Sequence, residues 1–260
     1  MFMKTVFLCG GFGTRIRDVA DDIPKPLIKV GQMPILWHLM SYYASFGYSE
    51  FVLCLGYKSE TIVDFFRSQS GIVQSIDKQP ELANVYKFSG LINGVKCDVT
   101  MADTGLEAMT GARLRKIKPL VGEETFMLSY GDGLSDVNLE KLVAHHRSGK
   151  KLLTVTGVRP PSRFGELQVD DKNNVTGFNE KPQASGGRIS GGFFVCEPGV
   201  FKYLENREDL VFEKEPIQSI VRDKQMDMYA HDEFWQCMDT YRDWELLNQM
   251  FRSGRAPWVR

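Results

Sequence analysis

The chain has 260 residues, of which 43% are hydrophobic and 25% charged, so it can form a substantial folded core and is not expected to be disordered. Lys and Arg number 32 against 33 Asp and Glu, so the net charge attracts neither nucleic acid nor an anionic membrane, and neither is expected as a partner. The five cysteines are widely spaced and include no CxxC pair, which argues against a disulfide framework or a zinc site and favours the cytoplasm.

The first hundred residues alternate between predicted strands and helices. Residues 5–9 form a compact apolar run that stops at two glycines, the pattern of a buried parallel strand. A helix is predicted over 34–46, a strand over 51–55, a helix over 60–66, and β-hairpin material within 68–100. This order implies a parallel sheet with right-handed crossovers.

The rest of the chain continues the same mixture. The sequence predicts helices over 110–120, 139–147, 213–222 and 241–251, strands over 125–130, 152–159 and 192–196, and a hairpin over 167–178. No repeat or linker interrupts the pattern, so we expect one domain over residues 1–260. The predicted fold is a Rossmann-like mixed, mostly parallel sheet flanked by helices, with a smaller antiparallel substrate-binding portion.

Three glycines follow the first predicted strand, in Gly10-Gly11-Phe12-Gly13, and Thr14 and Arg15 come next. Without Cβ atoms the backbone can approach a ligand closely, and a hydroxyl and a guanidinium suit phosphate oxygens. A Gly-rich turn with an exposed Arg has the same composition, so the loop alone leaves function open. Ile16 stands where a dinucleotide fingerprint needs Gly, and the Gly-Lys-Ser/Thr of a P-loop is absent.

Three charged residues suit a phosphate-binding site. The two prolines of Pro24-Lys25-Pro26 restrict the backbone around a lysine whose charge suits a triphosphate. A surface turn with a solvated lysine would have the same sequence. Asp132 follows a predicted buried strand, where open α/β sheets bind ligands. Asp239 precedes a predicted helix, and two carboxylates from distant segments can hold one Mg²⁺. A turn aspartate at 132 and an N-cap aspartate at 239 are the alternatives.

Two other groups of residues are not expected to act in chemistry. His145 and His146 are adjacent on a predicted helix and point about 100° apart, so they cannot easily share one metal ion, and both are predicted to lie on the surface. The aromatic residues Phe193, Phe194, Trp235 and Trp244 are predicted to lie in the core rather than to stack on a ligand.

Several stretches, spread over almost the whole chain, resemble the sugar-nucleotide pyrophosphorylases, a nucleotidyltransferase family. They are Gly10-Gly11-Phe12-Gly13-Thr14-Arg15, Pro24-Lys25-Pro26, Asp103-Thr104-Gly105, Met109-Thr110-Gly111-Ala112-Arg113, Tyr130-Gly131-Asp132-Gly133, Arg163-Phe164-Gly165, Glu180-Lys181-Pro182, Gly191-Gly192-Phe193-Phe194, Trp235-Gln236-Cys237-Met238-Asp239-Thr240 and Ala256-Pro257-Trp258. The pair Thr104-Gly105 with the block at 109–113, and the tail at 256–258, most resemble the cytidylyl branch of the family.

The resemblance implies Mg²⁺-dependent transfer of CMP from CTP to glucose 1-phosphate, which gives CDP-glucose and pyrophosphate. It implies a nucleotide-binding half over about 1–135 and a sugar-phosphate-binding half over about 136–260, and we expect a cytoplasmic homo-oligomer. Two alternatives remain open. The same reaction can use another nucleotide or another phosphorylated acceptor, or the chain can be a non-catalytic homologue that only binds a sugar nucleotide.

The same resemblance assigns roles to individual residues. The implied catalytic residues are Arg15, Lys25 and Asp132. The implied nucleotide contacts are Leu8, Cys9, Gly10, Gly11, Phe12, Gly13, Thr14, Arg15, Lys25, Thr110, Arg113 and Gly131. The implied sugar-phosphate contacts are Tyr130, Gly165, Glu180, Lys181 and Gly192, and the implied metal ligands are Asp132 and Asp239.

Overall fold

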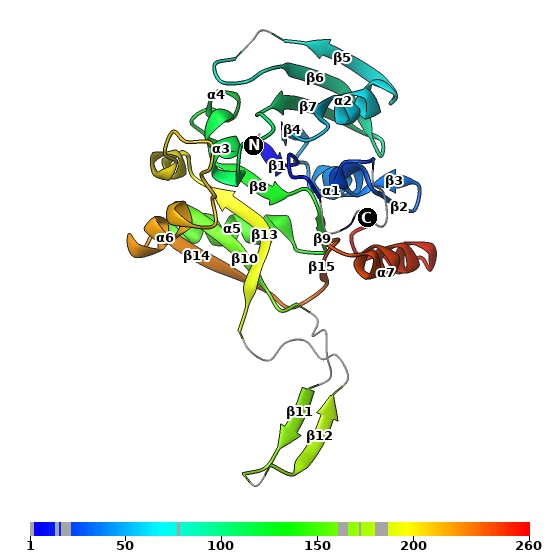
Figure 1. The fold of residues 1–260 in the computed structure, drawn as a ribbon, viewed down its shortest axis with the longest axis vertical. Helices are drawn as coiled ribbons and strands as arrows, with labels where there is room; N and C mark the ends of the chain where they lie inside the picture. The colour runs from blue at the N-terminus through cyan, green and yellow to red at the C-terminus, as the bar shows by residue number, and fades with distance from the viewer. Residues whose placement is uncertain are drawn as a thin grey trace.

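A nine-stranded sheet runs through the molecule in the order β14-β10-β13-β8-β1-β4-β7-β6-β5 (Figure 1). The computed structural model describes residues 3–13, 16, 22–76, 79–160, 166–171, 173–179 and 187–260. The strands of the sheet are β1 (Thr5–Leu8), β4 (Glu50–Leu55), β5 (Gly71–Ser75), β6 (Val85–Ile92), β7 (Val95–Asp103), β8 (Phe126–Tyr130), β10 (Leu153–Val158), β13 (Ile189–Cys196) and β14 (Met226–His231). Within this sheet only β6 and β13 run against the other strands, so the predicted mixed, mostly parallel sheet is confirmed.

Helices cover both faces of the sheet. They are α1 (Ile35–Ala44), α2 (Ser59–Arg67), α3 (Thr110–Lys116), α4 (Lys118–Val121), α5 (Leu139–Gly149), α6 (Glu215–Arg222) and α7 (Tyr241–Arg252), with 3-10 turns η2 (Lys25–Leu27) and η3 (Pro198–Tyr203). Side chains of α1, α2, α5 and α7 belong to one core cluster, and those of α3, α4 and α6 to a second. Among the described residues, every helix is too short or too polar to span a bilayer.

The two clusters explain why the central strands read as unbroken apolar runs. Successive side chains of a strand point to opposite faces: Phe7 lies in the first cluster and Val6 in the second. In β13, Phe193 and Phe194 divide in the same way, and both are buried as predicted. Because helices cover both faces, the central strands must be apolar on both sides.

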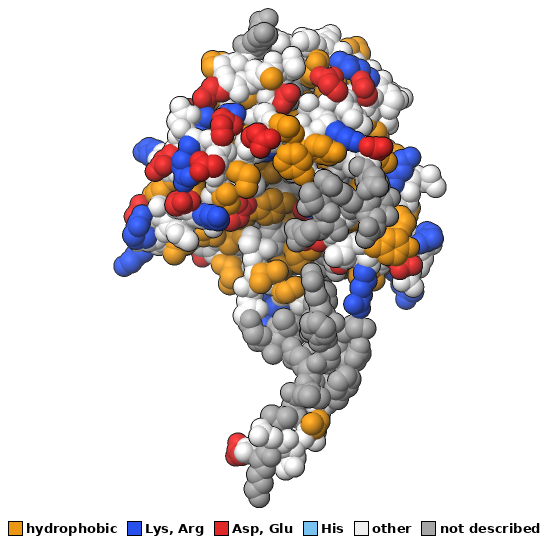
Figure 2. Space-filling model, viewed as in Figure 1, with side chains coloured by type: hydrophobic (Ala, Val, Ile, Leu, Met, Phe, Trp, Pro, Cys, Tyr) orange, Lys and Arg blue, Asp and Glu red, His pale blue; other side chains and the backbone are white. Residues whose placement is uncertain are grey.

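Three small antiparallel sheets complete the described fold. They pair β2 (Lys29–Val30) with β3 (Met33–Pro34), β9 (Gly133–Ser135) with β15 (Trp235–Cys237), and β11 (Glu166–Val169) with β12 (Val175–Asn179). The β11–β12 hairpin was predicted and extends from the body of the molecule (Figure 1). The centre of the face seen in Figure 2 is hollowed, and hydrophobic side chains gather around the hollow.

The predicted helix over 110–120 is wrong in its continuity, because the structure has two short helices there. The first ends at Lys116 and the second begins at Lys118, and Ile117 between them has φ −89° and ψ 5°. Pro119 has no N–H to donate and its ring crowds the preceding turn, so one straight helix cannot run through it.

The prediction that both adjacent histidines lie on the surface is wrong for His146, which is buried. Its Nδ1 lies 2.7 Å from the hydroxyl of Thr154, and its Nε2 lies 3.1 Å from Oε1 of Glu197. Burial lowers the pKa of His146, although the nearby Glu197 raises it in part. The helix α5 turns this side chain toward the sheet, so its neighbours come from β10 and from the end of β13.

Candidate active site

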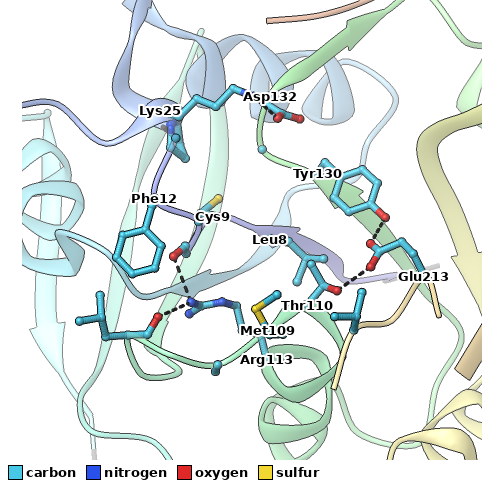
Figure 3. A pocket seen from close by; sticks show the side chains of 18 of the residues that line it. Leu8, Cys9, Phe12, Lys25, Met109, Thr110, Arg113, Tyr130, Asp132 and Glu213 are labelled. Atoms are coloured by element: carbon cyan, nitrogen blue, oxygen red, sulfur yellow. Dashed lines mark hydrogen bonds and ion pairs between the residues drawn. The ribbon is translucent and has the colours of Figure 1, made fainter. Parts of the chain in front are cut away.

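The candidate site lies at the carboxyl ends of β1 and β8, at the middle of the sheet. These strands are parallel neighbours with Leu8 opposite Tyr130, and the chain continues from β1 to one side of the sheet and from β8 to the other. Ligands bind in α/β sheets at such a switch point. A cavity of about 530 Å³ opens there (Figure 3), and the described residues that line it are 8–13, 16, 25, 26, 106–110, 113, 130–132, 211, 213 and 239.

The glycine loop that forms one wall of this cavity is shaped by a buried arginine. Arg113 is 4% exposed, and it donates hydrogen bonds to the carbonyl of Gly10 (3.0 Å) and to that of Leu55 (2.8 Å). It also donates hydrogen bonds to the hydroxyl of Thr104 and to the carbonyls of Gly105 and Leu106, and Leu106 lines the cavity too. A Cβ on Gly10 would lie 2.2 Å from Cζ of Arg113, so the guanidinium itself requires a glycine here. Arg113 therefore joins two walls of the cavity, and a direct contact with a nucleotide stays a prediction.

Three charged residues meet at one end of the cavity, as the sequence predicted for Lys25, Asp132 and Asp239. The ammonium of Lys25 lies 2.5 Å from Oδ2 of Asp132 and 2.6 Å from Oδ1 of Asp239. Burial alone would lower the pKa of Lys25, but the charge of Asp132 and the hydrogen bonds to both carboxylates raise it above the ordinary value. The lysine is therefore fully charged at neutral pH.

Backbone pairing brings the two aspartates together. Strand β9 follows Asp132 and pairs with β15, which precedes Asp239, and the amide of Met238 donates to the carbonyl of Asp132 at 2.9 Å. The next helix, α7, is capped by the hydroxyl of Thr240 in a capping box with Asp243. Asp239 is therefore not the N-cap, and its carboxylate lies at the cavity instead.

A second cavity of about 290 Å³ adjoins the first and shares Tyr130, Asp132 and Asp239 with it. Its other described lining residues are 129, 133, 190–193, 235 and 237. Gly192 has φ +78°, and a Cβ there would lie 2.5 Å from the ring of Tyr130. Trp235, which was predicted to be a core residue, is half-buried and lines this cavity, where its indole N–H donates to the carbonyl of Gly191 at 2.7 Å.

The sequence of this chain matches a known protein family over most of its length. The model of the nucleotidyl transferase family matches residues 4–245. The chain belongs to the nucleotidyl transferase family.

Individual relatives agree with this assignment. A probable glucose-1-phosphate cytidylyltransferase of Bacillus subtilis (strain 168) is 40% identical over 256 residues, which cover 98% of this chain and 99% of that protein. A glucose-1-phosphate cytidylyltransferase of Salmonella typhi is 35% identical over 257 residues, which cover 98% of each. The structure of HddC from Yersinia pseudotuberculosis shares the fold, with a TM-score of 0.69 at 20% identity over 96% of this chain and 100% of that chain.

The sequence missed one charged residue of this nucleotidyl transferase site. Glu213 lines the larger cavity beside Tyr130 and Thr110 (Figure 3), and both hydroxyls donate hydrogen bonds to its carboxylate. Glu213 is 103 positions from Thr110 along the chain and lies in no motif that the sequence singled out. A single glutamate at the start of a predicted helix carries no signal that distinguishes it from a solvated surface residue.

The remaining predicted site residues divide into two groups. Leu8, Cys9, Gly11, Phe12, Gly13 and Gly131 all line the larger cavity. Thr14, Arg15, Gly165, Glu180 and Lys181 lie outside the described residues, so their predicted roles stay predictions. Cys237 was not predicted, and it lies at the smaller cavity, where burial and then the charges of Asp239 and Asp132 raise the pKa of its thiol to about 12.

The two aspartates fit a magnesium ion. Among the described residues, no group of three or more His, Cys, Asp or Glu side chains could hold a metal. Magnesium in phosphate-transfer sites is commonly held by one or two carboxylates together with substrate phosphates and water. Asp132 and Asp239 already converge on one cation, the Lys25 ammonium, so the pair has the spacing to hold a divalent one.

Proposed function

We propose that this nucleotidyl transferase transfers CMP from CTP to glucose 1-phosphate and releases pyrophosphate. The names of its two curated relatives above and their near-complete coverage support this choice of substrates. The observation that carries the proposal is that two adjoining cavities share Asp132 and Asp239 beside Lys25. Such a junction suits a reaction that joins two phosphorylated substrates.

In the proposed reaction a phosphate oxygen of glucose 1-phosphate attacks the α-phosphorus of CTP in line. A new P–O bond forms, and the bond from the α-phosphorus to the oxygen that bridges to the β-phosphate breaks, so the electron pair leaves on pyrophosphate. The attacking monoester is already an anion, so no side chain has to remove a proton. The protein must instead hold two polyanions together and stabilise the charge that develops on the leaving oxygens.

The described residues are assigned to this reaction by their place around the junction. Lys25 supplies a fixed positive charge beside the triphosphate, and the loop at 8–13 surrounds the nucleotide. The smaller cavity, with Tyr130 and Gly192 on its walls, receives the sugar phosphate. The family resemblance alone assigns Arg15 to the leaving group and Glu180 and Lys181 to the acceptor, because these residues lie outside the described part of the chain. A magnesium ion held by Asp132 and Asp239 would supply charge neutralisation for the phosphates.

The decisive experiment is a matrix of the four nucleoside triphosphates against several sugar 1-phosphates with magnesium, in which released pyrophosphate is measured. We expect the highest kcat/KM for CTP with glucose 1-phosphate. If another nucleotide and sugar phosphate give the highest kcat/KM, the proposed substrates change but the proposed reaction stays. Binding of CTP or CDP-glucose without pyrophosphate from any pair would mean a non-catalytic homologue and would refute the proposal. Light scattering on the same sample tests the expected homo-oligomer.

A further inference from the structure

One wall of the larger cavity is a segment, residues 208–213, that is docked on the start of α3. The amide of Met109 donates to the carbonyl of Glu208 (2.8 Å), and the amide of Gly111 donates to that of Leu210 (2.9 Å). A Cβ on Gly111 would lie 2.8 Å from Cγ of Leu210, so the close approach needs a glycine. Because these carbonyls occupy amides at the first turn of α3, the helix does not present those N–H groups to an anion.

The docked segment ends at Glu213, whose carboxylate is held from two sides. Thr110 Oγ1 donates to Oε2 at 2.7 Å, and the hydroxyl of Tyr130 donates to Oε1 (Figure 3). Thr110 Oγ1 also accepts the amide of Phe212 at 2.9 Å, so its hydroxyl already has a donor and an acceptor within the protein. A carboxylate accepts about four hydrogen bonds, and two are used here. Glu213 therefore keeps acceptor capacity at the cavity.

The charges at the cavity separate its two ends. Lys25 and Asp132 lie on the side opposite Thr110 and Met109, and Glu213 lies beside Tyr130 away from Lys25 (Figure 3). With the magnesium ion of the proposed function on Asp132 and Asp239, the Lys25 end of the cavity would carry a net positive charge. Phosphates are then attracted to that end and repelled by the glutamate. A nucleotide with its phosphates beside Lys25 therefore places its nucleoside toward Glu213. Leu8, Met109 and Val211, which also line the cavity, offer that nucleoside apolar contacts.

We propose that Glu213 determines nucleotide specificity by accepting a hydrogen bond from the nucleoside. This proposal rests on the proposed function and names the feature of the nucleotide that the site recognises. An ionised carboxylate only accepts, so it favours a nucleoside group that donates. The amino group of cytosine donates, whereas uracil and thymine carry a carbonyl oxygen at the same position, which a carboxylate repels. The 2′-hydroxyl of the ribose, which dCTP lacks, is the second donor of this kind, and the experiment separates the two.

The test compares kcat/KM for CTP, UTP and dCTP in the wild type, in Glu213→Gln and in Glu215→Gln. Glutamine keeps the shape of the side chain and can accept from Tyr130 or Thr110, but it loses the charge and can donate to a carbonyl. Glu215 is the matched control: it is exposed, it pairs with Arg207 at 3.2 Å, and it does not line the cavity. Its replacement removes the same charge two positions away.

A hydrogen bond to a charged group at an exposed position corresponds to about a tenfold effect. If the amino group is the donor, Glu213→Gln lowers the preference for CTP over UTP by about tenfold and leaves the ratio of CTP to dCTP unchanged. If the ribose 2′-hydroxyl is the donor, the preference for CTP over dCTP falls and the ratio of CTP to UTP is unchanged. Glu215→Gln should behave as the wild type in both ratios.

The proposal is overturned if Glu213→Gln changes neither ratio, or lowers kcat/KM equally for all three nucleotides, because Glu213 would then only hold the wall in place. Failure of the proposed function is seen separately, as a wild type that yields no pyrophosphate with CTP. In that case calorimetric binding of the same three nucleotides gives the two ratios, and a lack of binding to all of them overturns both proposals. An unchanged thermal midpoint shows that each variant is folded.

Discussion

Replacing Lys25 by Met should unbalance the charged centre of the site in a measurable way. The lysine lies 2.5 and 2.6 Å from two carboxylates, and the exposed fractions of the three side chains are 12% for Lys25, 29% for Asp132 and 15% for Asp239. Removing one partner of a buried ion pair costs about 3–5 kcal/mol. Because Asp132 keeps some contact with water, we expect the lower end, about 3 kcal/mol, which corresponds to a fall of about 6–12 °C in the thermal midpoint.

The loss should be independent of pH across the neutral range. The pKa of Lys25 is raised in the folded protein, so its stabilising charge is complete below the ordinary pKa of lysine and is lost only in strong alkali, as the pH rises through the raised value. Turnover should fall by about a hundred- to a thousand-fold, the usual effect of removing one preorganised charge from a site of this kind.

Magnesium should then compensate for the missing ammonium. A ligand that binds only the folded state raises its stability in proportion to ln(1 + [L]/Kd), and in the variant the cation meets two carboxylates that no lysine neutralises. Scanning calorimetry across a magnesium titration, without nucleotide, should therefore show a larger upward shift for Lys25→Met than for the wild type. Lys29→Met, which removes an exposed lysine four positions away, is the matched control. The reasoning fails if Lys25→Met matches that control in both its midpoint and its magnesium response.

Three further predictions concern neighbouring parts of the structure. Gly10→Ala should lower the free energy of unfolding by about 1–3 kcal/mol in a denaturant titration, because its Cβ would lie 2.2 Å from Arg113. Gly11→Ala is the control, since a Cβ there meets nothing within 4 Å, and equal stabilities of the two variants would contradict the prediction. Since burial lowers the pKa of His146, the unfolded chain binds the proton more readily, so the free energy of unfolding should fall from pH 7 to pH 5. The His146→Gln variant should lose less stability than the wild type over that range, and equal losses in the two proteins would exclude the histidine as the cause. Because the pKa of Cys237 is raised to about 12, alkylation at pH 8, followed by mass spectrometry, should be about a thousandfold slower than for a free thiol; labelling at the rate of a free thiol would show that the thiolate forms.

The strands and the glycine loop were predictable because their signals are local. Residues 5–8 and 126–130 are apolar on both faces, which only a covered central strand requires. The rule that ligands bind beyond the ends of such strands placed Asp132 at the site. Asp239 is different: its position depends on the pairing of β9 with β15, which lie about a hundred residues apart, and no local pattern specifies that register. Its role was inferred through the family resemblance.

The sequence could not separate residues that contact a ligand from residues that build the wall around it. His146 is predicted from the sequence to lie on the surface, yet it is buried, with Thr154 and Glu197 beside it. Gly10 is predicted to let a ligand approach the backbone, and it does line the cavity, but the structure adds a second reason for glycine, because a Cβ there would lie 2.2 Å from Arg113. In both cases the deciding neighbour is far away in the chain, so the cause appears only in the folded structure.

The block at residues 109–113 can influence specificity through the segments that it holds, in addition to any contact that its own side chains make with a nucleotide. The amides of Met109 and Gly111 hold the segment 208–213, and the hydroxyl of Thr110 holds its last residue, Glu213. Arg113 fastens the opposite loop. A substitution in this block would therefore move both walls of the cavity, even where the replaced side chain never meets a nucleotide. It follows that transplanting the block alone into a relative of different nucleotide preference should not transfer the preference, because the acceptor that faces the nucleoside is supplied by the segment the block holds.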